Sequence, residues 1–422
     1  MDQTYTSSCL TISADTSSDT NAGFLHDRDM LGWTTCVHPD LVTPWEGPTP
    51  GWHYGSGFGG STLEKSRLNG IAAPKGPRGI CCGAAPAKMF MDTSILGDRG
   101  WILQERILSR RILHWSTYEV SWECNECIAS ERLPAGHGNG GQLWGWAGRD
   151  TYRPPWNEFR NILFPDTNKN SFDSVLGPKP IMEANDWHDL VREFSRRKLT
   201  VVTDRLPAIS GLSNAFGKSA KRPLSSYRFG LWEETLTYDL CWFSTVIRNK
   251  PEEQNVIQKS SDMPSFSWAS INTPIDFLHP FNLDEAIEHV EVVSLSDVSM
   301  SPPSITLRGL VFNMDLLAKQ RPENPYGGLK DGLKDTIIWD VPDPDHLAAQ
   351  REDVICLCFG VVERIDNVDV DEGSHGLLGL LLEPIASDQG GATETYRRIG
   401  LYDGLRPAVD IREMERRTLT VV

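Results

Sequence analysis

The fold of this chain is decided by residues 98–132, which read DRGWILQERILSRRILHWSTYEVSWECNECIASER. The first part predicts a helix beginning near Arg99, with Asp98 as its capping residue. Trp101, Leu103 and Ile107 give this helix a partial apolar face. Glu105 and Arg106 lie between these apolar positions, and in an arbitrary helix such a charged pair is exposed to solvent.

The second part predicts an antiparallel hairpin. Arg111–Trp115 and Tyr118–Cys124 alternate apolar and polar residues around a short break at 116–117. Trp101, Trp115 and Trp122 are expected to be core anchors, because an indole buries a large apolar area and its single N–H needs only one partner. A helix that leads into a hairpin is therefore expected.

This helix and hairpin together resemble the closing part of the fungal heterokaryon incompatibility (HET) domain. The matching positions are Arg99, Gly100, Trp101, Leu103, Gln104, Glu105, Arg106, Trp122, Glu123 and Cys124, with Leu113-His114-Trp115 and Ala129-Ser130-Glu131 beside them. The resemblance continues into the region that commonly follows a HET domain, through Asp204–Gly211, Gly230–Glu233 and Pro264–Ser270. The earlier motifs of the family are absent, so Met1 is expected to match an internal methionine of the family, in a shortened gene model or a naturally reduced member.

The resemblance implies two functions from different classes. HET domains are similar to TIR domains, which have an open α/β sheet and in some cases cleave NAD through a glutamate. On that hypothesis NAD is the substrate, Glu105 is the first catalytic candidate and Glu123 the second, and Arg99 or Arg106 would contact the pyrophosphate. The alternative is a protein of non-self recognition and programmed cell death signalling that acts through protein interaction.

We favour interaction over catalysis for this chain. Loss of the early strands would leave Ser8–Ala14 as an unpaired sheet edge, which favours self-association or pairing with a full-length HET or NLR-type partner. No cofactor and no metal site are predicted.

Composition and charge argue against several classes of protein. The formal charge of −16 argues against a nucleic-acid-binding surface, and the basic run Arg196-Arg197-Lys198 is explained by the end of a helix. The apolar runs are shorter than the roughly 20 residues that span a bilayer, and no secretory signal is found. Nine cysteines without framework spacing favour a reducing, cytoplasmic location.

Three short motifs have better structural explanations than functional ones. The G-x-G-x-x-G pattern at 55–60 lacks the strand and helix of a dinucleotide site, and the acidic run at 366–372 lacks the spacing of an EF-hand. Cys124 and Cys127 have the spacing of half a zinc knuckle and of a redox pair, but buried cysteines are the simpler interpretation.

Four regions and a mixed α+β and α/β fold are expected. Residues 1–135 form the C-terminal part of a TIR-like α/β HET domain with a Gly/Pro-rich insertion at 39–83, and 136–184 form an irregular linker. Residues 185–275 are predicted to form three helices, each with an apolar stripe. The first stripe is Trp187, Leu190, Val191 and Phe194, and the second is Leu206, Ile209, Leu212 and Phe216, in a helix that Gly217 ends. The third is Phe229, Trp232, Leu236, Leu240 and Phe243. Residues 276–422 are predicted to form an antiparallel β module, a small sheet or barrel, from apolar runs beginning at 305, 354, 377, 397 and 418.

Overall fold

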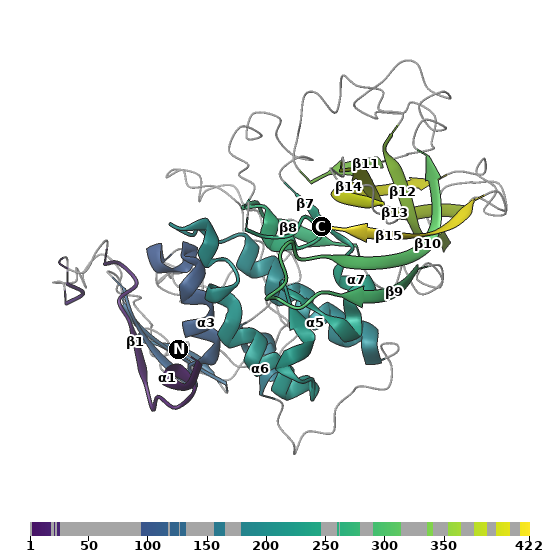
Figure 1. The fold of residues 1–422 in the computed structure, drawn as a ribbon. Coiled ribbons are helices and arrows are strands. Elements are labelled where there is room, and N and C mark those ends of the chain that lie inside the picture. Colours follow the sequence, from purple (N-terminus) through teal and green to yellow (C-terminus); the bar gives the residue numbers. More distant parts are fainter. Residues whose placement is uncertain are drawn as a thin grey trace, which may run out of the picture.

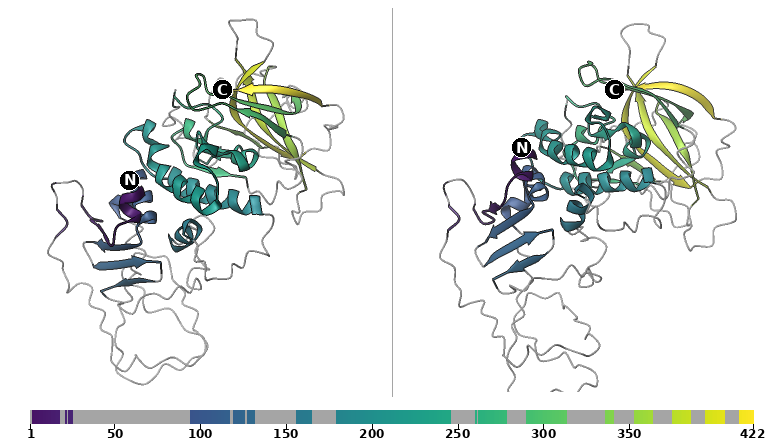
Figure 2. Two further views of the ribbon diagram at one scale, coloured as in Figure 1. Left: turned by 60° about the horizontal axis from the view of Figure 1, so that its bottom comes forward. Right: turned by 90° about the horizontal axis from the view of Figure 1, so that it is seen from below.

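The computed structural model describes residues 2–17, 21, 23–25, 94–116, 119–125, 127–131, 156–164, 179–245, 260, 262–278, 290–313, 336–340, 353–363, 375–385, 394–405 and 414–422. A small sheet, a group of helices and a larger β structure follow one another along the molecule, and the helices lie between the two sheets (Figures 1 and 2). The expected mixture of α and β structure is confirmed. The insertion at 39–83 and the motifs at 55–60 and 366–372 lie outside the described residues.

The small sheet has four strands in the order β1-β2-β3-β4, with bounds Thr11–Ser13, Arg111–Trp115, Val120–Cys124 and Ile128–Ser130. The predicted hairpin is confirmed as β2 and β3, which are antiparallel. β1 pairs with β2 in the parallel direction, and helix α3, Gly100–Leu108, precedes β2. A parallel strand pair with a helix in the connection is the unit from which α/β folds are built.

The start of α3 differs from the prediction. Asp98 belongs to a short 3-10 helix, η3, Ile95–Asp98, and the residue before α3 is Arg99, whose side chain makes no capping bond. The backbone of Lys198 holds this point instead, because its N–H donates to Asp98 O and its carbonyl accepts from Gly100 N. A methyl group at Gly100 would lie 2.5 Å from Leu199 Cδ2, which explains the glycine.

The face of the sheet toward α3 is polar, contrary to the expectation of indole anchors. Ile112, His114, Ser121 and Glu123 are buried, whereas Trp115 and Trp122 alternate with them and are only half-buried, as is Trp101 on α3. The apolar side of α3 packs into the helical core instead, through Leu103, Ile107 and Leu108.

The helical region begins earlier than predicted. Helix α4, Trp156–Leu163, lies inside the expected linker, and α5, Lys179–Ser195, begins before residue 185. The predicted apolar face of α5 is confirmed, since all four of its residues are buried. Helix α6, Ser210–Ala220, does not stop at Gly217 but continues to Ala220, and the residue that caps its end, Lys221, has a φ of 58°.

The third predicted helix is wrong. Its first residues form two short strands, β5, Tyr227–Arg228, and β6, Leu231–Trp232, which pair with each other. A 3-10 turn at 233–235 and a single helical turn, α7, Leu236–Asp239, follow. The last residues form strand β7, Trp242–Ser244, which pairs with β8, Ile275–Phe277. The helix is interrupted because Phe229 and Gly230 have φ values of 54° and 89°. All five residues of the predicted stripe are nevertheless buried.

The predicted carboxy-terminal β module is a closed barrel. Its strands are β10, Ile305–Asn313, β12, Ile355–Glu363, β13, His375–Pro384, β14, Thr395–Leu405, and β15, Glu415–Val421. They pair in the order β10-β12-β13-β14-β15, and β15 returns to β10 to close the ring. β9, Val290–Leu295, pairs with β10, and β11, Thr336–Trp339, pairs with β14.

The helices and the barrel share one continuous core. Buried apolar residues run continuously from α3, α5 and α6 to β10, β12, β13 and β15. Arg398 on β14 reinforces this junction, since its guanidinium pairs with Asp340, donates to the carbonyls of Leu240 and Trp242, and stacks on the Trp242 ring at 3.6 Å. Among the described residues, no helix has the length and apolar character needed to cross a membrane.

Candidate functional site

The most concentrated group of charged side chains lies between α3 and the small sheet. We call it the Glu123 cluster; its members are Asp15, Arg106, His114, Glu123 and Arg160, each less than 9% exposed. Arg106 donates to Glu123 Oε2 from Nη2 at 2.8 Å and from Nε at 3.1 Å, and Arg160 Nη1 lies 2.7 Å from Glu123 Oε1. Each carboxylate oxygen of Glu123 therefore forms an ion pair with a guanidinium group.

His114 joins the two carboxylates of the cluster. Its Nδ1 lies 2.9 Å from Asp15 Oδ2 and its Nε2 lies 3.0 Å from Glu123 Oε2. A ring with a carboxylate on each nitrogen is best satisfied in the protonated form, in which both nitrogens donate. Ser13 completes the chain of bonds, since its hydroxyl donates to Asp15 Oδ1 at 2.5 Å.

Strand alternation and register place these residues together. His114 on β2 and Glu123 on β3 both point toward α3, and Arg106 reaches them from the sheet side of α3. Arg160 arrives from α4, where its Nη2 also donates to the carbonyl of Arg106 at 2.8 Å. Side chains from three successive elements, α3, β2 and β3, and from α4 further along the chain therefore meet at one carboxylate.

The surroundings shift the pKa values of this cluster in opposite directions. Burial alone would raise the pKa of Glu123, but the charges of Arg106 and Arg160 and the bond from His114 hold it well below its usual value. Burial alone would lower the pKa of His114, but its bonds to Asp15 and Glu123 outweigh this effect and the pKa is raised. The cluster is thus built to keep Glu123 ionised and His114 charged.

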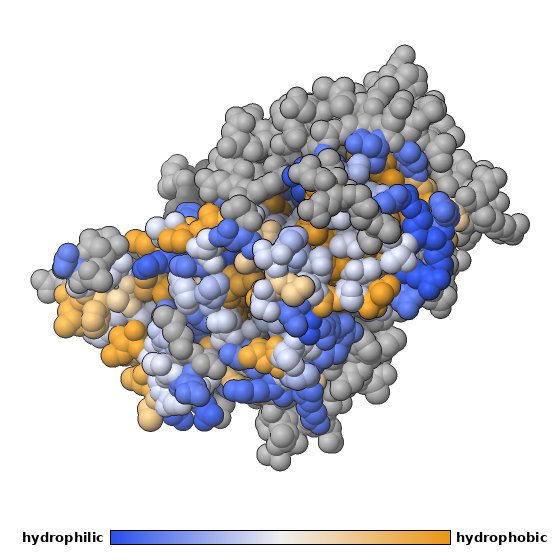
Figure 3. Space-filling model, in the orientation of Figure 1, coloured by the Kyte–Doolittle hydropathy of each residue, from blue (hydrophilic) through white to orange (hydrophobic). Residues whose placement is uncertain are grey.

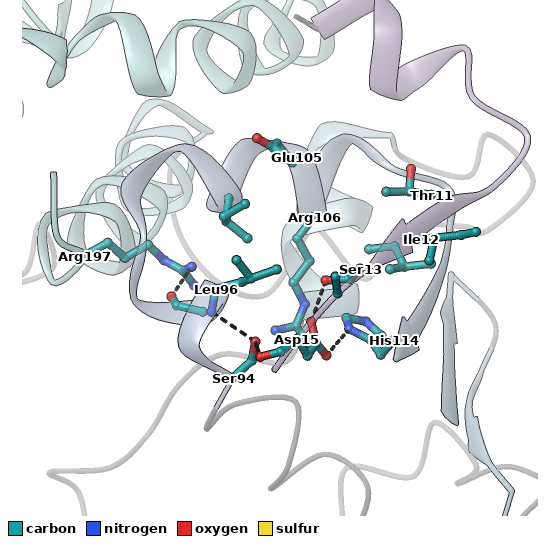
Figure 4. A pocket seen from close by; sticks show the side chains of 14 residues that line it. Thr11, Ile12, Ser13, Asp15, Ser94, Leu96, Glu105, Arg106, His114 and Arg197 are labelled. Atoms are coloured by element: carbon teal, nitrogen blue, oxygen red, sulfur yellow. Dashed lines mark hydrogen bonds and ion pairs between the residues drawn. The ribbon is translucent and has the colours of Figure 1, made fainter. Parts of the chain in front are cut away.

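A cavity of about 230 Å³ lies on the β1 side of this cluster. Its lining includes Ser13, Asp15, Glu105, Arg106, His114 and Arg197 (Figure 4). Asp15, Arg106 and His114 lie together at one end, and the Glu105 carboxylate lies at the opposite end (Figure 4). Arg197 is committed to protein partners, because it donates to the Gly97 carbonyl at 2.5 Å and to Glu193 at 3.0 Å.

Glu105 is the most accessible of the predicted acidic candidates. It is half-buried, and Tyr5 of the first helix, α1, Asp2–Thr6, faces it. Burial, hydrogen bonding to Glu105 and the charge of Glu105 all raise the pKa of Tyr5, so this phenol stays protonated beside the carboxylate. Glu105 therefore lines the cavity with a neutral phenol as its neighbour.

The structure separates the four candidates predicted from sequence. Glu105 and Arg106 both line the cavity, and Arg106 is buried rather than part of a solvated pair. Glu123 is 0% exposed and lies behind the cavity wall, where its oxygens are occupied by protein partners. Arg99 is exposed at the start of α3 and does not line the cavity.

Sequence reasoning misses three members of the cluster. It names His114 only within the HET-like run Leu113-His114-Trp115, without a catalytic role, and Asp15 and Arg160 carry no motif. The alternation of β2 and β3 could have placed His114 and Glu123 on one face, because a hairpin register fixes which side chains are neighbours. Nothing local in the sequence indicates that α4 delivers Arg160.

No family model, no curated protein and no solved structure matches this chain. Among the described residues, no group of three or more His, Cys, Asp or Glu side chains is placed to hold a metal ion. The function of the chain is therefore inferred from the geometry of the site and of the strands around it.

Proposed function

We propose that this chain is a HET-type protein of fungal non-self recognition and programmed cell death signalling, and that it acts mainly through protein interaction. The observation that supports this most directly is the position of β1 at one end of the four-stranded sheet. Among the described strands, β1 has a neighbour on one side only, which is β2. An unpaired edge is a template for a strand from another chain.

The side chains at this edge suit a protein partner. Ile12 in β1 is 54% exposed and Leu10 just before it is 44% exposed. Apolar residues gather at the end of the molecule where β1 lies (Figure 3). Exposed apolar side chains beside an open edge favour strand addition, because natural edges that avoid pairing usually carry charges or proline.

The backbone of Ile12 is oriented for such pairing. The N–H of Asp15 donates to Trp115 O on β2 at 3.1 Å. Because N–H groups of a strand alternate in direction, those of Ser13 and Thr11 also face β2, and that of Ile12 faces the open side. The residue with the most exposed side chain in β1 therefore also offers the outward main-chain groups.

Substitution at Ile12 tests this function. Ile12→Lys places a charge on the edge and should reduce both self-association, measured by light scattering, and cell death on expression in a filamentous fungus, measured by dye uptake. Leu224→Lys is the matched control, because Leu224 is 52% exposed and belongs to a 3-10 helix rather than to a strand of this sheet. Equal association and equal cell death in the wild type and the Ile12→Lys variant would contradict the proposal.

A second candidate function is NAD cleavage, which the position of Glu105 supports. This carboxylate borders the cavity at the end opposite Arg106, so it could stabilise positive charge that develops at a ribose. The cavity volume of about 230 Å³ is smaller than the roughly 300–1,000 Å³ typical of small-molecule sites, which favours interaction over turnover of a dinucleotide.

Nicotinamide release from NAD separates the two functions. The interaction proposal expects no release above buffer, with or without Glu105→Gln. Release by the wild type that is lost in Glu105→Gln, with unchanged thermal unfolding of the variant, would replace the interaction proposal with the enzymatic one.

A further inference from the structure

Cys124 and Cys127 face each other across the turn that joins β3 and β4. The register of the two strands pairs Glu123 with Ile128, so Cys124 and Cys127 form the next opposed pair. The N–H of Cys124 donates to the carbonyl of Cys127 at 3.0 Å, and the two Sγ atoms lie 3.9 Å apart. Opposed, hydrogen-bonded residues of antiparallel strands have Cα atoms about 5.5 Å apart, which is the separation that most disulfides span.

The geometry points to a reversible dithiol–disulfide site formed by Cys124 and Cys127. The two sulfur atoms must approach from 3.9 Å to about 2.05 Å, which rotation of the side chains achieves without moving the strands. Both residues are half-buried, so a small oxidant reaches them from solvent. The cross-link would join β4 to β3 directly beside Glu123.

The oxidant we propose is a low-molecular-weight disulfide such as glutathione disulfide. One cysteine thiolate attacks a sulfur of that disulfide, forms a mixed disulfide and releases one glutathione thiolate. The second cysteine thiolate then attacks the bound cysteine sulfur and releases the second glutathione. Two protein thiols lose two electrons, one glutathione disulfide gains them, and the two thiol protons end on two glutathione molecules.

The other described cysteines provide controls of two kinds. Cys356 and Cys358 are both 0% exposed on β12, and burial raises the pKa of each thiol, that of Cys358 to about 12. They should not react in the native protein, because the thiolate is the reactive form. Cys9 is exposed and shows whether the oxidant has acted on an accessible thiol.

Tryptic peptides separate these cysteines. Cleavage at arginine releases residues 112–132 with Cys124 and Cys127 as its only cysteines, and residues 352–364 with Cys356 and Cys358. The native full-length chain is equilibrated in glutathione buffers of increasing oxidised fraction, quenched with acid, denatured and labelled with N-ethylmaleimide. Mass spectrometry then reports the state of each peptide.

We expect peptide 112–132 to appear without label and lighter by two hydrogens, with a disulfide fraction roughly tenfold above that of peptide 352–364. Dithiothreitol should restore the doubly labelled form. Cys124→Ser should leave Cys127 as a glutathione adduct or a labelled thiol. Three results would overturn the assignment. Peptide 112–132 could carry two labels under conditions that modify Cys9, or it could carry only mixed disulfides with glutathione. Its labelling could also be blocked in a way that a chelator reverses.

Discussion

Arg106 on α3 donates two hydrogen bonds to a single oxygen of Glu123 on β3, at 2.8 and 3.1 Å. Both side chains are buried, with 7% and 0% exposure. The helix and the hairpin on which the HET proposal is based are therefore joined by a shared interior, but that interior is ionic. A cluster of this kind is sensitive to the loss of any one charge, because the remaining charges stay buried without compensation.

Removal of the Glu123 carboxylate should destabilise the chain strongly. Glu123→Ala leaves the guanidinium groups of Arg106 and Arg160 and the ring of His114 facing an uncharged space. We predict a loss of about 3–5 kcal/mol in the free energy of unfolding, which is typical when one partner of a buried ion pair is removed. Urea unfolding followed by circular dichroism measures it.

Asp98 provides the matched control for this prediction. It also forms an ion pair, with Lys198 at 3.2 Å, but the two side chains are 59% and 82% exposed. Asp98→Asn should change the unfolding free energy by less than about 1 kcal/mol, because exposed ion pairs contribute little. A similar effect of the two substitutions would mean that the Glu123 cluster does not stabilise the fold.

His114 should make stability depend on pH above about pH 6.5. Its pKa in the folded chain is raised from 6.5 by the bonds to Asp15 and Glu123, which outweigh burial. The group therefore contributes its full stabilisation below about pH 6.5 and loses it as the pH rises through the folded-state pKa. Unfolding midpoints in urea, measured from pH 6 upward, should decline.

The His114→Gln variant isolates this contribution. The amide is uncharged at every pH, so the decline in the unfolding midpoint above pH 6.5 should flatten in the variant. Parallel pH profiles for the wild type and the variant would show that another group causes the dependence.

The elements with strict alternation or a long apolar run could be predicted from sequence. The strand at Arg111–Trp115 has its predicted bounds, and each of the five barrel strands overlaps a predicted apolar run, because a buried strand needs a continuous or alternating apolar pattern that few other structures require. Within the site, the family resemblance points to Glu105 and Arg106, and both line the cavity.

The parts that failed depend on interactions that are distant in sequence. The stripe from Phe229 to Phe243 is buried, yet it does not form one helix, because the left-handed turn at Phe229 and Gly230 is stabilised by residues much later in the chain, such as Trp268. The full compensation of the charge on Glu123 could not be foreseen, because Arg160 reaches it from α4, which is distant in sequence. The large size of an indole favours a core position. Whether a strand residue is buried, however, depends on the face of the sheet on which it lies.

The tryptophans should therefore separate into two classes on substitution. Trp268 is 0% exposed and donates to the Gly230 carbonyl at 2.9 Å, so Trp268→Ala should cost about 3–5 kcal/mol. Trp101 is half-buried, and its Nε1 donates to Asp204 at a longer 3.3 Å. Trp101→Ala should cost only about 1–2 kcal/mol. Equal losses in thermal unfolding experiments would place Trp101 in the core after all.

Gly23 and Gly230 both have positive φ, and Gly230 should tolerate replacement by alanine less well than Gly23. Its φ is 89°, and a methyl group there would lie 2.6 Å from Trp268 Nε1 and 2.9 Å from Trp268 Cε2. Gly230→Ala therefore combines a backbone penalty of about 1–3 kcal/mol with displacement of a fully buried indole. Gly23→Ala is the matched control, because Gly23 has a φ of 68° and nothing within 4 Å of the added carbon. Urea unfolding should show a loss in Gly230→Ala that exceeds the loss in Gly23→Ala, and near-equal losses would mean that the Trp268 ring moves aside without cost.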